Sequence, residues 1–178
     1  MMVISVGLGL LIIRFVGGLT IAAHGAQKLF GWFGGPGFTK LEQGFQKQGF
    51  KPAWLWVCFV ILGEFGGGLS FALGFLTPLG AAGIFGAMLM AIFKSHWKNG
   101  FWNSKRGYEF PLSLLAMSVG IGLAGPGIYS LDALFGIALP NPLLFGVLAI
   151  AALLVDVIGL YISREPAVEQ TPVKPHAS

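Results

Sequence analysis

Long apolar segments alternate with short polar ones along the whole chain. The first covers 23 residues, all of which are apolar or glycine except Ser5, Arg14 and Thr20. A helix of this length crosses a hydrocarbon core of about 30 Å, because each residue adds about 1.5 Å. The pattern therefore predicts a membrane span over Val3–Gln27. The segment has no basic start and no small-residue cleavage site, so we expect a retained helix and not a signal peptide.

The same pattern predicts four more spans, so that five helices cross the membrane. They cover Pro52–Leu76, Pro78–Phe93, Tyr108–Ala124 and Pro142–Ile162. Glycine clusters in the second and third spans would let neighbouring backbones approach closely. Between the first two spans, a capping box at Thr39–Glu42 predicts the start of a short helix along the membrane surface. The stretch 164–178, rich in proline and charge, is predicted to be a disordered cytoplasmic tail.

The composition agrees with a membrane protein. Of 178 residues 55% are hydrophobic and 10% are charged, against about 25% charged in ordinary soluble domains, and the mean hydropathy is +0.79. The net charge of +4 does not indicate a nucleic-acid partner, because the basic residues are spread over several loops and form no continuous stripe. Cys58 is the single cysteine, so one chain can build neither a dithiol redox pair nor a thiolate metal site, and we expect no bound metal.

Lysine and arginine gather on one side of the predicted topology. The connections after the first and third spans and the stretch after the fifth hold ten of the eleven basic residues, namely Lys28, Lys40, Lys47, Lys51, Lys94, Lys98, Lys105, Arg106, Arg164 and Lys174. By the positive-inside rule this side is cytoplasmic. The amino terminus is therefore predicted to lie outside and the carboxyl terminus in the cytoplasm, which requires an odd number of spans.

Two opposite charges fall near the centres of the first two predicted spans, Arg14 in the first and Glu64 in the second. A charge at this depth costs about 2.5 kcal/mol or more, so both side chains should face the protein interior and be paired. We predict a buried ion pair between them, which serves either the structure alone or a polar relay. Asp156, inside the fifth span, is expected to pair with another subunit or with loop donors.

Polar residues from three helix ends are expected to meet on the cytoplasmic side. They are His24, Gln27, Lys28, His96, Tyr108 and Glu109. The first three share one face of the first helix, because residues three and four apart are neighbours. We predict that these side chains line one cavity, which binds a lipid-soluble substrate or takes up a proton. The alternative is that the two histidines only hydrogen-bond to backbone or water and that Glu109 only stabilises a helix amino terminus.

Several motifs in this order resemble the DoxX family of small bacterial membrane proteins. They are Arg14, the run His24–Gly31, Phe33–Gly37, Glu64 before its glycines, His96 with Asn99–Phe101, Tyr108–Glu109, Gly125–Gly127 and Ser130–Asp132. The resemblance implies an all-α fold with a compact four-helix transmembrane bundle over 1–132. It also implies the bacterial inner membrane. The stretch 133–163 then adds a loop and a fifth transmembrane helix that the short family form lacks.

The resemblance also directs the functional hypotheses. The family name derives from a subunit of a thiosulfate:quinone oxidoreductase, and other members are described as partners of cytosolic redox proteins. The first hypothesis is therefore a membrane component of a quinone-linked redox system, an oxidoreductase subunit whose own catalysis stays open. The alternatives are a structural or recruiting subunit for a soluble partner, and a small solute or proton transporter that uses Arg14 with Glu64.

Cofactors and partners follow from these hypotheses. A quinone is the candidate cofactor, and its ring would suit the aromatic surface around Phe30, Trp32 and Phe33. A haem held by His24 and His96 is not expected, because histidines at two helix ends are weak evidence for haem ligation. The expected partners are the lipid bilayer, a soluble or membrane redox protein and further copies of the chain.

Overall fold

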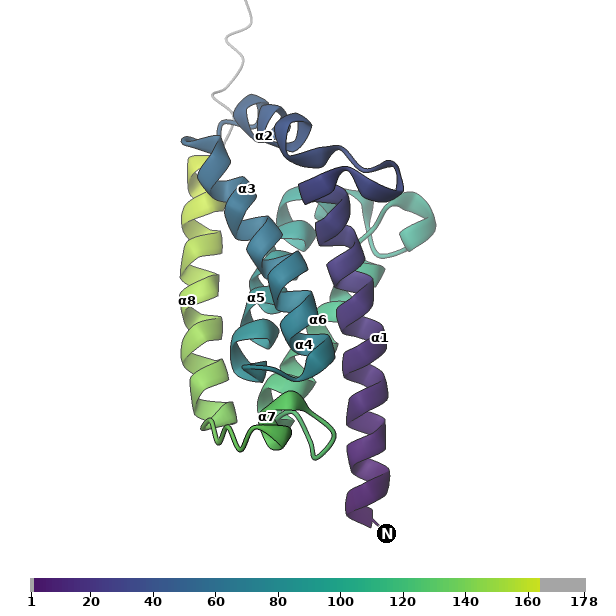
Figure 1. Ribbon diagram of the computed structural model, residues 1–178. Helices are drawn as coiled ribbons and strands as arrows, with labels where there is room; N and C mark the ends of the chain where they lie inside the picture. The colour runs from purple at the N-terminus through teal and green to yellow at the C-terminus, as the bar shows by residue number, and fades with distance from the viewer. Residues whose placement is uncertain (1, 164–178) are drawn as a thin grey trace, which may run out of the picture.

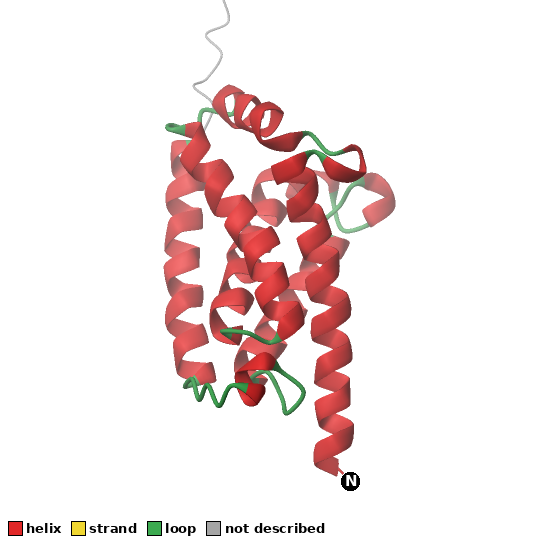
Figure 2. Ribbon diagram, in the orientation of Figure 1, coloured by secondary structure: helices red, strands yellow, loops and turns green. Residues whose placement is uncertain are grey.

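The computed structural model describes residues 2–163, which form helices joined by loops (Figure 2), and no strand occurs within that range. The predicted tail, 164–178, lies outside the described residues. The helices in chain order are α1 (Met2–Phe30), α2 (Gly37–Lys47), α3 (Ala53–Ile61), α4 (Gly67–Leu73), α5 (Thr77–Ala91), α6 (Glu109–Ala124), α7 (Leu131–Leu134) and α8 (Asn141–Ile162). Two π-helical turns, η2 (Leu62–Gly66) and η3 (Ile92–His96), continue α3 into α4 and extend α5. Three short 3₁₀ turns lie in the connections, η1 (Trp32–Gly34), η4 (Trp97–Asn99) and η5 (Asn103–Lys105).

The predicted all-α membrane fold is confirmed. Four helical segments are long and apolar enough to cross a bilayer, namely Met2–Phe30, Ala53–Leu73, Thr77–Asn99 and Asn141–Ile162. The remaining predicted span is α6, an apolar helix of 16 residues, which is shorter than the other four. It packs against α5 and α8 inside the bundle. The protein is therefore a multi-pass membrane protein, in which four candidate membrane spans and the shorter helix α6 are roughly aligned.

Passes that follow one another in the chain run in opposite directions (Figure 1). The amino terminus of α1 and the last turn of α8 lie at opposite ends of the bundle, and α1 extends beyond the other helices at its own end. The α5 and α8 helices run in parallel, because Gly86 faces Ala152 and Met90 faces Gly159. The added fifth pass is thus packed directly on α5. The division of the chain at residue 132 stays a prediction.

The short helix α2 lies across the end of the bundle where α1 ends (Figure 1). It begins at Gly37, two residues before Thr39, and the N-cap residue before it, Pro36, makes no side-chain capping bond. The predicted capping box is therefore wrong. The loop after α2 is held instead by aromatic packing, because Phe50 is 1% exposed and its ring lies 4.8 Å from that of Phe45 and 5.3 Å from that of Trp56.

A close helix contact joins α1 to the η2–α4 segment through glycine. A Cβ atom on Gly18 would lie 2.5 Å from the Ala72 nitrogen, and one on Gly68 would lie 2.6 Å from the Ala22 nitrogen. Gly25 is packed in the same way against the backbone of Phe65. Small residues permit such backbone contact in membrane helices. Three contacts along one antiparallel pair fix which residues of α1 and α4 lie at the same depth.

We expect Gly18→Ala to lower the free energy of unfolding by about 1–3 kcal/mol, because the new methyl group overlaps the α4 backbone. Gly9→Ala on the same helix is the matched control, since a Cβ there meets no atom within 4 Å. The control should be neutral or stabilising by up to about 1 kcal/mol, from helix propensity alone. Thermal unfolding in detergent, followed by circular dichroism, measures both. Equal effects of the two substitutions would contradict the proposed contact.

Candidate functional site

Arg14 and Glu64 do not form the predicted ion pair. Glu64 pairs with Lys28, whereas Nη2 of Arg14 donates a hydrogen bond to the backbone oxygen of Tyr129 at 2.5 Å. The glycine contacts of α1 place Glu64 beside Lys28, and Lys28 lies about 21 Å along the helix from Arg14. The two charges therefore occupy different depths. The transport hypothesis loses its basis here, because it required Arg14 and Glu64 to form one midplane site.

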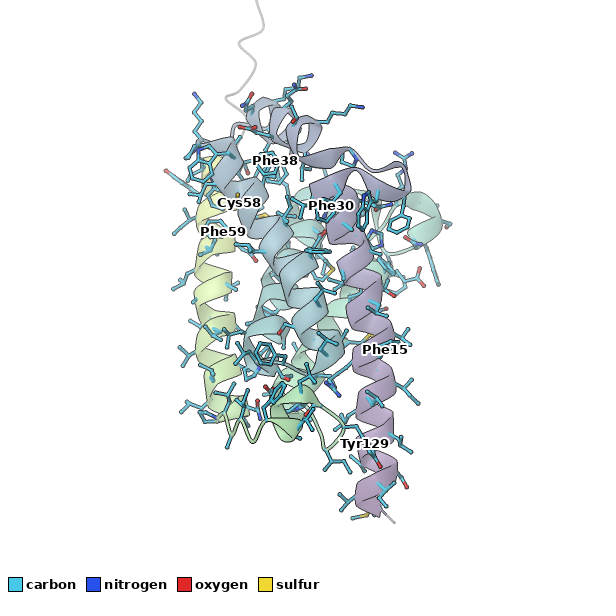
Figure 3. All side chains as sticks on the ribbon, viewed as in Figure 1. Phe15, Phe30, Phe38, Cys58, Phe59 and Tyr129 are labelled. Carbon is cyan, nitrogen blue, oxygen red and sulfur yellow. The ribbon has the colours of Figure 1, made fainter. Side chains whose placement is uncertain are left out.

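Arg14 is fully buried where α1 passes the turn between α4 and α5. Its guanidinium fills the space next to Gly74, where even a Cβ atom would overlap Nη1. Tyr129 supplies its backbone oxygen from the loop before α7, beside α1 in Figure 3. Among the described residues, Nε and Nη1 have no hydrogen-bond partner. The compensating negative charge is Asp132, which is close enough to interact electrostatically.

Asp132 holds the amino-terminal end of α5. Its Oδ1 accepts a hydrogen bond from the Leu76 N–H at 2.7 Å. Its Oδ2 accepts from the Thr77 N–H at 3.0 Å and from the Thr77 hydroxyl at 2.7 Å. Leu76 has φ +49°, a left-handed conformation that is strained for a leucine. The sequence predicts no partner for Asp132, because Leu76 and Thr77 lie 56 and 55 residues away in the chain.

The Lys28–Glu64 pair lies near the opposite end of the bundle. The Glu64 side chain is 3% exposed and that of Lys28 is 28% exposed, so the pair reaches from the interior toward the surface. Glu64 sits on the π-helical turn η2, a feature frequent at functional sites. Next to it, the ring of Phe30 lies edge-on to Phe65 at 5.6 Å and stacks on Trp32 at 4.7 Å. The charged pair is thus bordered by the aromatic surface expected from the sequence.

The other predicted site residues have local partners at the same end. The His24 ring lies 5.5 Å from the Phe110 ring, beside the start of α6. Gln27 donates a hydrogen bond to the Phe33 oxygen at 3.4 Å.

His96, Tyr108 and Glu109 all stabilise the connection between η3 and α6. Nδ1 of His96 lies 2.7 Å from the Arg106 oxygen. Tyr108 stacks on Trp97 with ring centroids 5.3 Å apart. Glu109 accepts a hydrogen bond from the Asn103 N–H at 2.9 Å. The structure therefore gathers these residues at one end, but none of the six predicted site residues lines either of the two cavities described below. Their shared cavity stays a prediction.

The main candidate site is an apolar, partly open groove of about 510 Å³ between three passes. One wall is α3, η2 and α4, the floor is α5 and the other wall is α8. Phe59, labelled in Figure 3, projects into it from α3. The groove extends from Trp56 and Met90, near the end covered by α2, to Leu76 and Leu79 at the other end. We call it the α5 groove.

Glycines give the α5 groove its depth. Gly63 and Gly67 face Gly83 and Gly80 across the α4–α5 contact, so no side chains fill the space above them. Gly66 also lines the groove, and a Cβ there would meet no atom within 4 Å. The sequence reading identified both glycine clusters as packing signals. The sequence does not predict that these glycines enclose a groove, because the groove depends on the position of α8 alongside them.

One carboxyl group lines the α5 groove. Asp156 of α8 is 7% exposed, and its Oδ2 has no hydrogen-bond partner among the described residues. Buried polar groups are normally paired, so this one is a functional candidate. A second groove of about 480 Å³ lies between α1, α4 and the loop that leads into α7, and it contains no charged side chain.

The family model of DoxX matches residues 9–97, which include Arg14, the Lys28–Glu64 pair and the glycines of η2, α4 and α5. The chain belongs to the DoxX family. No curated protein and no solved structure matches the chain. The matched DoxX segment ends at Trp97, so α6, Asp132 on α7 and Asp156 on α8 lie outside it. The α5 groove is thus built by two passes of the DoxX segment and one pass beyond it.

We expect Asp132→Asn to lower the free energy of unfolding by about 3 kcal/mol or more. It removes the charge that compensates the buried Arg14, and it replaces one of the two accepting oxygens by an NH2 group, so that either the Leu76 N–H or the Thr77 N–H loses its acceptor. Glu64→Gln is the comparison and should have a smaller effect, because the partly exposed Lys28 can extend into solvent. Thermal unfolding in detergent ranks the two variants. A larger loss for Glu64→Gln would contradict this assignment of partners.

Proposed function

We propose that this DoxX-family protein is a membrane component of a quinone-linked redox system and that it holds a lipid-soluble quinone in the α5 groove. The observation that supports this proposal is the groove itself. Its volume of about 510 Å³ lies within the range of small-molecule sites, and its lining is apolar except for a few groups. It lies between membrane-spanning helices, so a ligand can enter from the bilayer.

The chemistry of the walls fits a flat ring with an apolar tail. The glycines of η2 and α5 allow a ring to approach the backbone closely, and Phe59 and Trp56 offer aromatic faces. Asp156 is the charged side chain among the lining residues. We further propose that the polar residues predicted from the sequence, which lie at the α2 end, exchange protons between the aqueous phase and that end of the bundle. They are His24, Gln27, Lys28, His96, Tyr108 and Glu109.

A second candidate function is recruitment of a soluble partner, favoured by one observation. Six basic residues of the connections at the α2 end are exposed, namely Lys40, Lys47, Lys51, Lys98, Lys105 and Arg106. Glu42 is the acidic residue of α2 and is half-buried. A surface of this charge steers negatively charged partners toward it. The two functions are compatible, since a redox partner would dock at this end.

We expect Gly66→Leu to abolish quinone binding without unfolding the protein. The leucine side chain extends into the α5 groove, where a Cβ meets no atom within 4 Å. The measurement is binding of a long-chain quinone analogue to the purified protein in lipid nanodiscs, read by quenching of tryptophan fluorescence. Gly120→Leu is the matched control, because Gly120 also has an open Cβ position but lies on α6 outside the groove.

The two leucine variants separate the outcomes. Binding lost in Gly66→Leu and kept in Gly120→Leu supports the α5 groove as the site. If both variants keep binding, the ligand lies elsewhere. If the wild type binds no quinone analogue, the quinone proposal fails and recruitment is the better account.

Orientation is part of the proposal, with the α2 end in the cytoplasm of a bacterial cell and the α7 end outside the inner membrane. In a Cys58→Ser background, Phe135→Cys should react with a membrane-impermeant thiol reagent in intact cells, and Lys105→Cys should react only after permeabilisation. Both positions are exposed. The reverse labelling pattern would overturn the positive-inside assignment.

A further inference from the structure

Asp156 differs from the two other buried acidic residues. Asp132 accepts three hydrogen bonds, and Glu64 pairs with Lys28. Asp156 is buried, with 7% of its surface exposed, and yet it has no hydrogen bond or ion pair among the described residues. Helix packing does not require an acid here, since the neighbouring α8 contact is made by Ala152 against Gly86. A buried ionisable group without a structural task in a membrane helix indicates a binding role.

We propose that Asp156 accepts a hydrogen bond from the head group of the groove's occupant, which is a long-chain amphiphile with a hydroxyl-bearing aromatic head, a hydroquinone. This inference rests on the proposed function and adds which residue holds the head and what the head must carry. Asp156 lines the groove, and its buried Oδ2, about 3.9 Å from the position of a Cβ on Gly86, has no hydrogen-bond partner among the described residues. A hydroxyl donor satisfies it, and a methoxy group cannot.

The shape of the groove orients the occupant. Between Leu76 and Met90 the groove follows α5 over about 21 Å, so it takes an extended chain as well as a ring. Asp156 lies toward the end with Trp56 and Met90, where the head belongs. At the opposite end the hydroxyl of Ser70 already donates a hydrogen bond to the Phe75 oxygen at 2.5 Å. That end is therefore the place for the apolar tail.

The charge of the lining argues against a phospholipid as the occupant. Within residues 2–163 no lysine, arginine or histidine lines the α5 groove, so a phosphate would lie next to a carboxyl group without a cationic partner from this part of the chain. Burying an unpaired phosphate charge is strongly unfavourable. A hydroquinone head carries donors and no charge. It therefore matches Asp156, whose free atom needs a donor.

The test uses the full-length protein in nanodiscs and three probes with the same tail. They are a long-chain hydroquinone kept under reductant, its dimethyl ether, which lacks the donors, and the corresponding quinone. Binding is measured for the wild type, Asp156→Leu and Asp156→Asn. Glu42→Gln is the control for loss of an acidic charge outside the groove. Competition by added phospholipid tests the alternative occupant.

We expect the wild type to bind the hydroquinone about tenfold more tightly than the dimethyl ether, the size of one good hydrogen bond. Asp156→Leu should lose this preference and still bind both probes through the tail. Asp156→Asn, which keeps one acceptor oxygen and nearly the same shape, should show a reduced preference and keeps the test valid if the leucine variant fails to fold. Glu42→Gln should behave like the wild type.

Three results would overturn the inference. If the wild type binds the ether as tightly as the hydroquinone, the hydroxyl groups of the head do not contribute to binding. A preference unchanged in both Asp156 variants assigns the head to another residue. Displacement of every probe by phospholipid makes lipid the occupant. Quinone binding itself is tested separately, by the Gly66→Leu experiment. If none of the three probes binds, both the proposed function and this inference are wrong.

Discussion

The close backbone contact between α1 and the η2–α4 segment sets the arrangement of the charged residues in this protein. Gly18, Gly25 and Gly68 bring the two backbones together, and each would clash with the opposite chain if it carried a side chain. Because the contact recurs along the pair, it fixes their depth relative to each other. Arg14 is thereby placed beside Gly74, and Lys28 beside Glu64. Two separate polar sites follow from one packing constraint.

The two polar sites have different chemistry. At the α7 end, Arg14 and Asp132 join α1, the α4–α5 turn and the loop before α7 through buried bonds, and Asp132 supports the strained Leu76. This arrangement ties the segments together, because Arg14 and Asp132 each form a hydrogen bond with the backbone of another segment. At the α2 end, Lys28 and Glu64 form a pair that is open on one side. The closed site suits stability, and the open site suits exchange with the surface.

The η2–α4 segment has a second face, and this face makes the candidate site. Its glycines meet those of α5, and α8 completes the walls of the α5 groove. The groove is apolar and lies among the membrane-spanning helices, which is why we propose a lipid-soluble ligand for it. Within residues 2–163, Asp156 is the acid that lines the groove, and it comes from a pass that the DoxX match does not include. The functional proposal therefore depends on the packing of α8 against α5.

The sequence alone determined the apolar helical segments and the gathering of basic residues at one end, because hydropathy and charge are properties of each segment by itself. It also placed Arg14, Glu64 and Asp156 inside apolar helices. It could not pair them, since the connection over residues 31–52 is long and leaves the register of α1 against α4 free. Only the tertiary structure decided that Lys28 reaches Glu64, that Asp132 caps α5, and that Asp156 lines a groove. Each of these depends on which side chain lies opposite across a helix contact, and that is set by backbone packing between segments far apart in the chain.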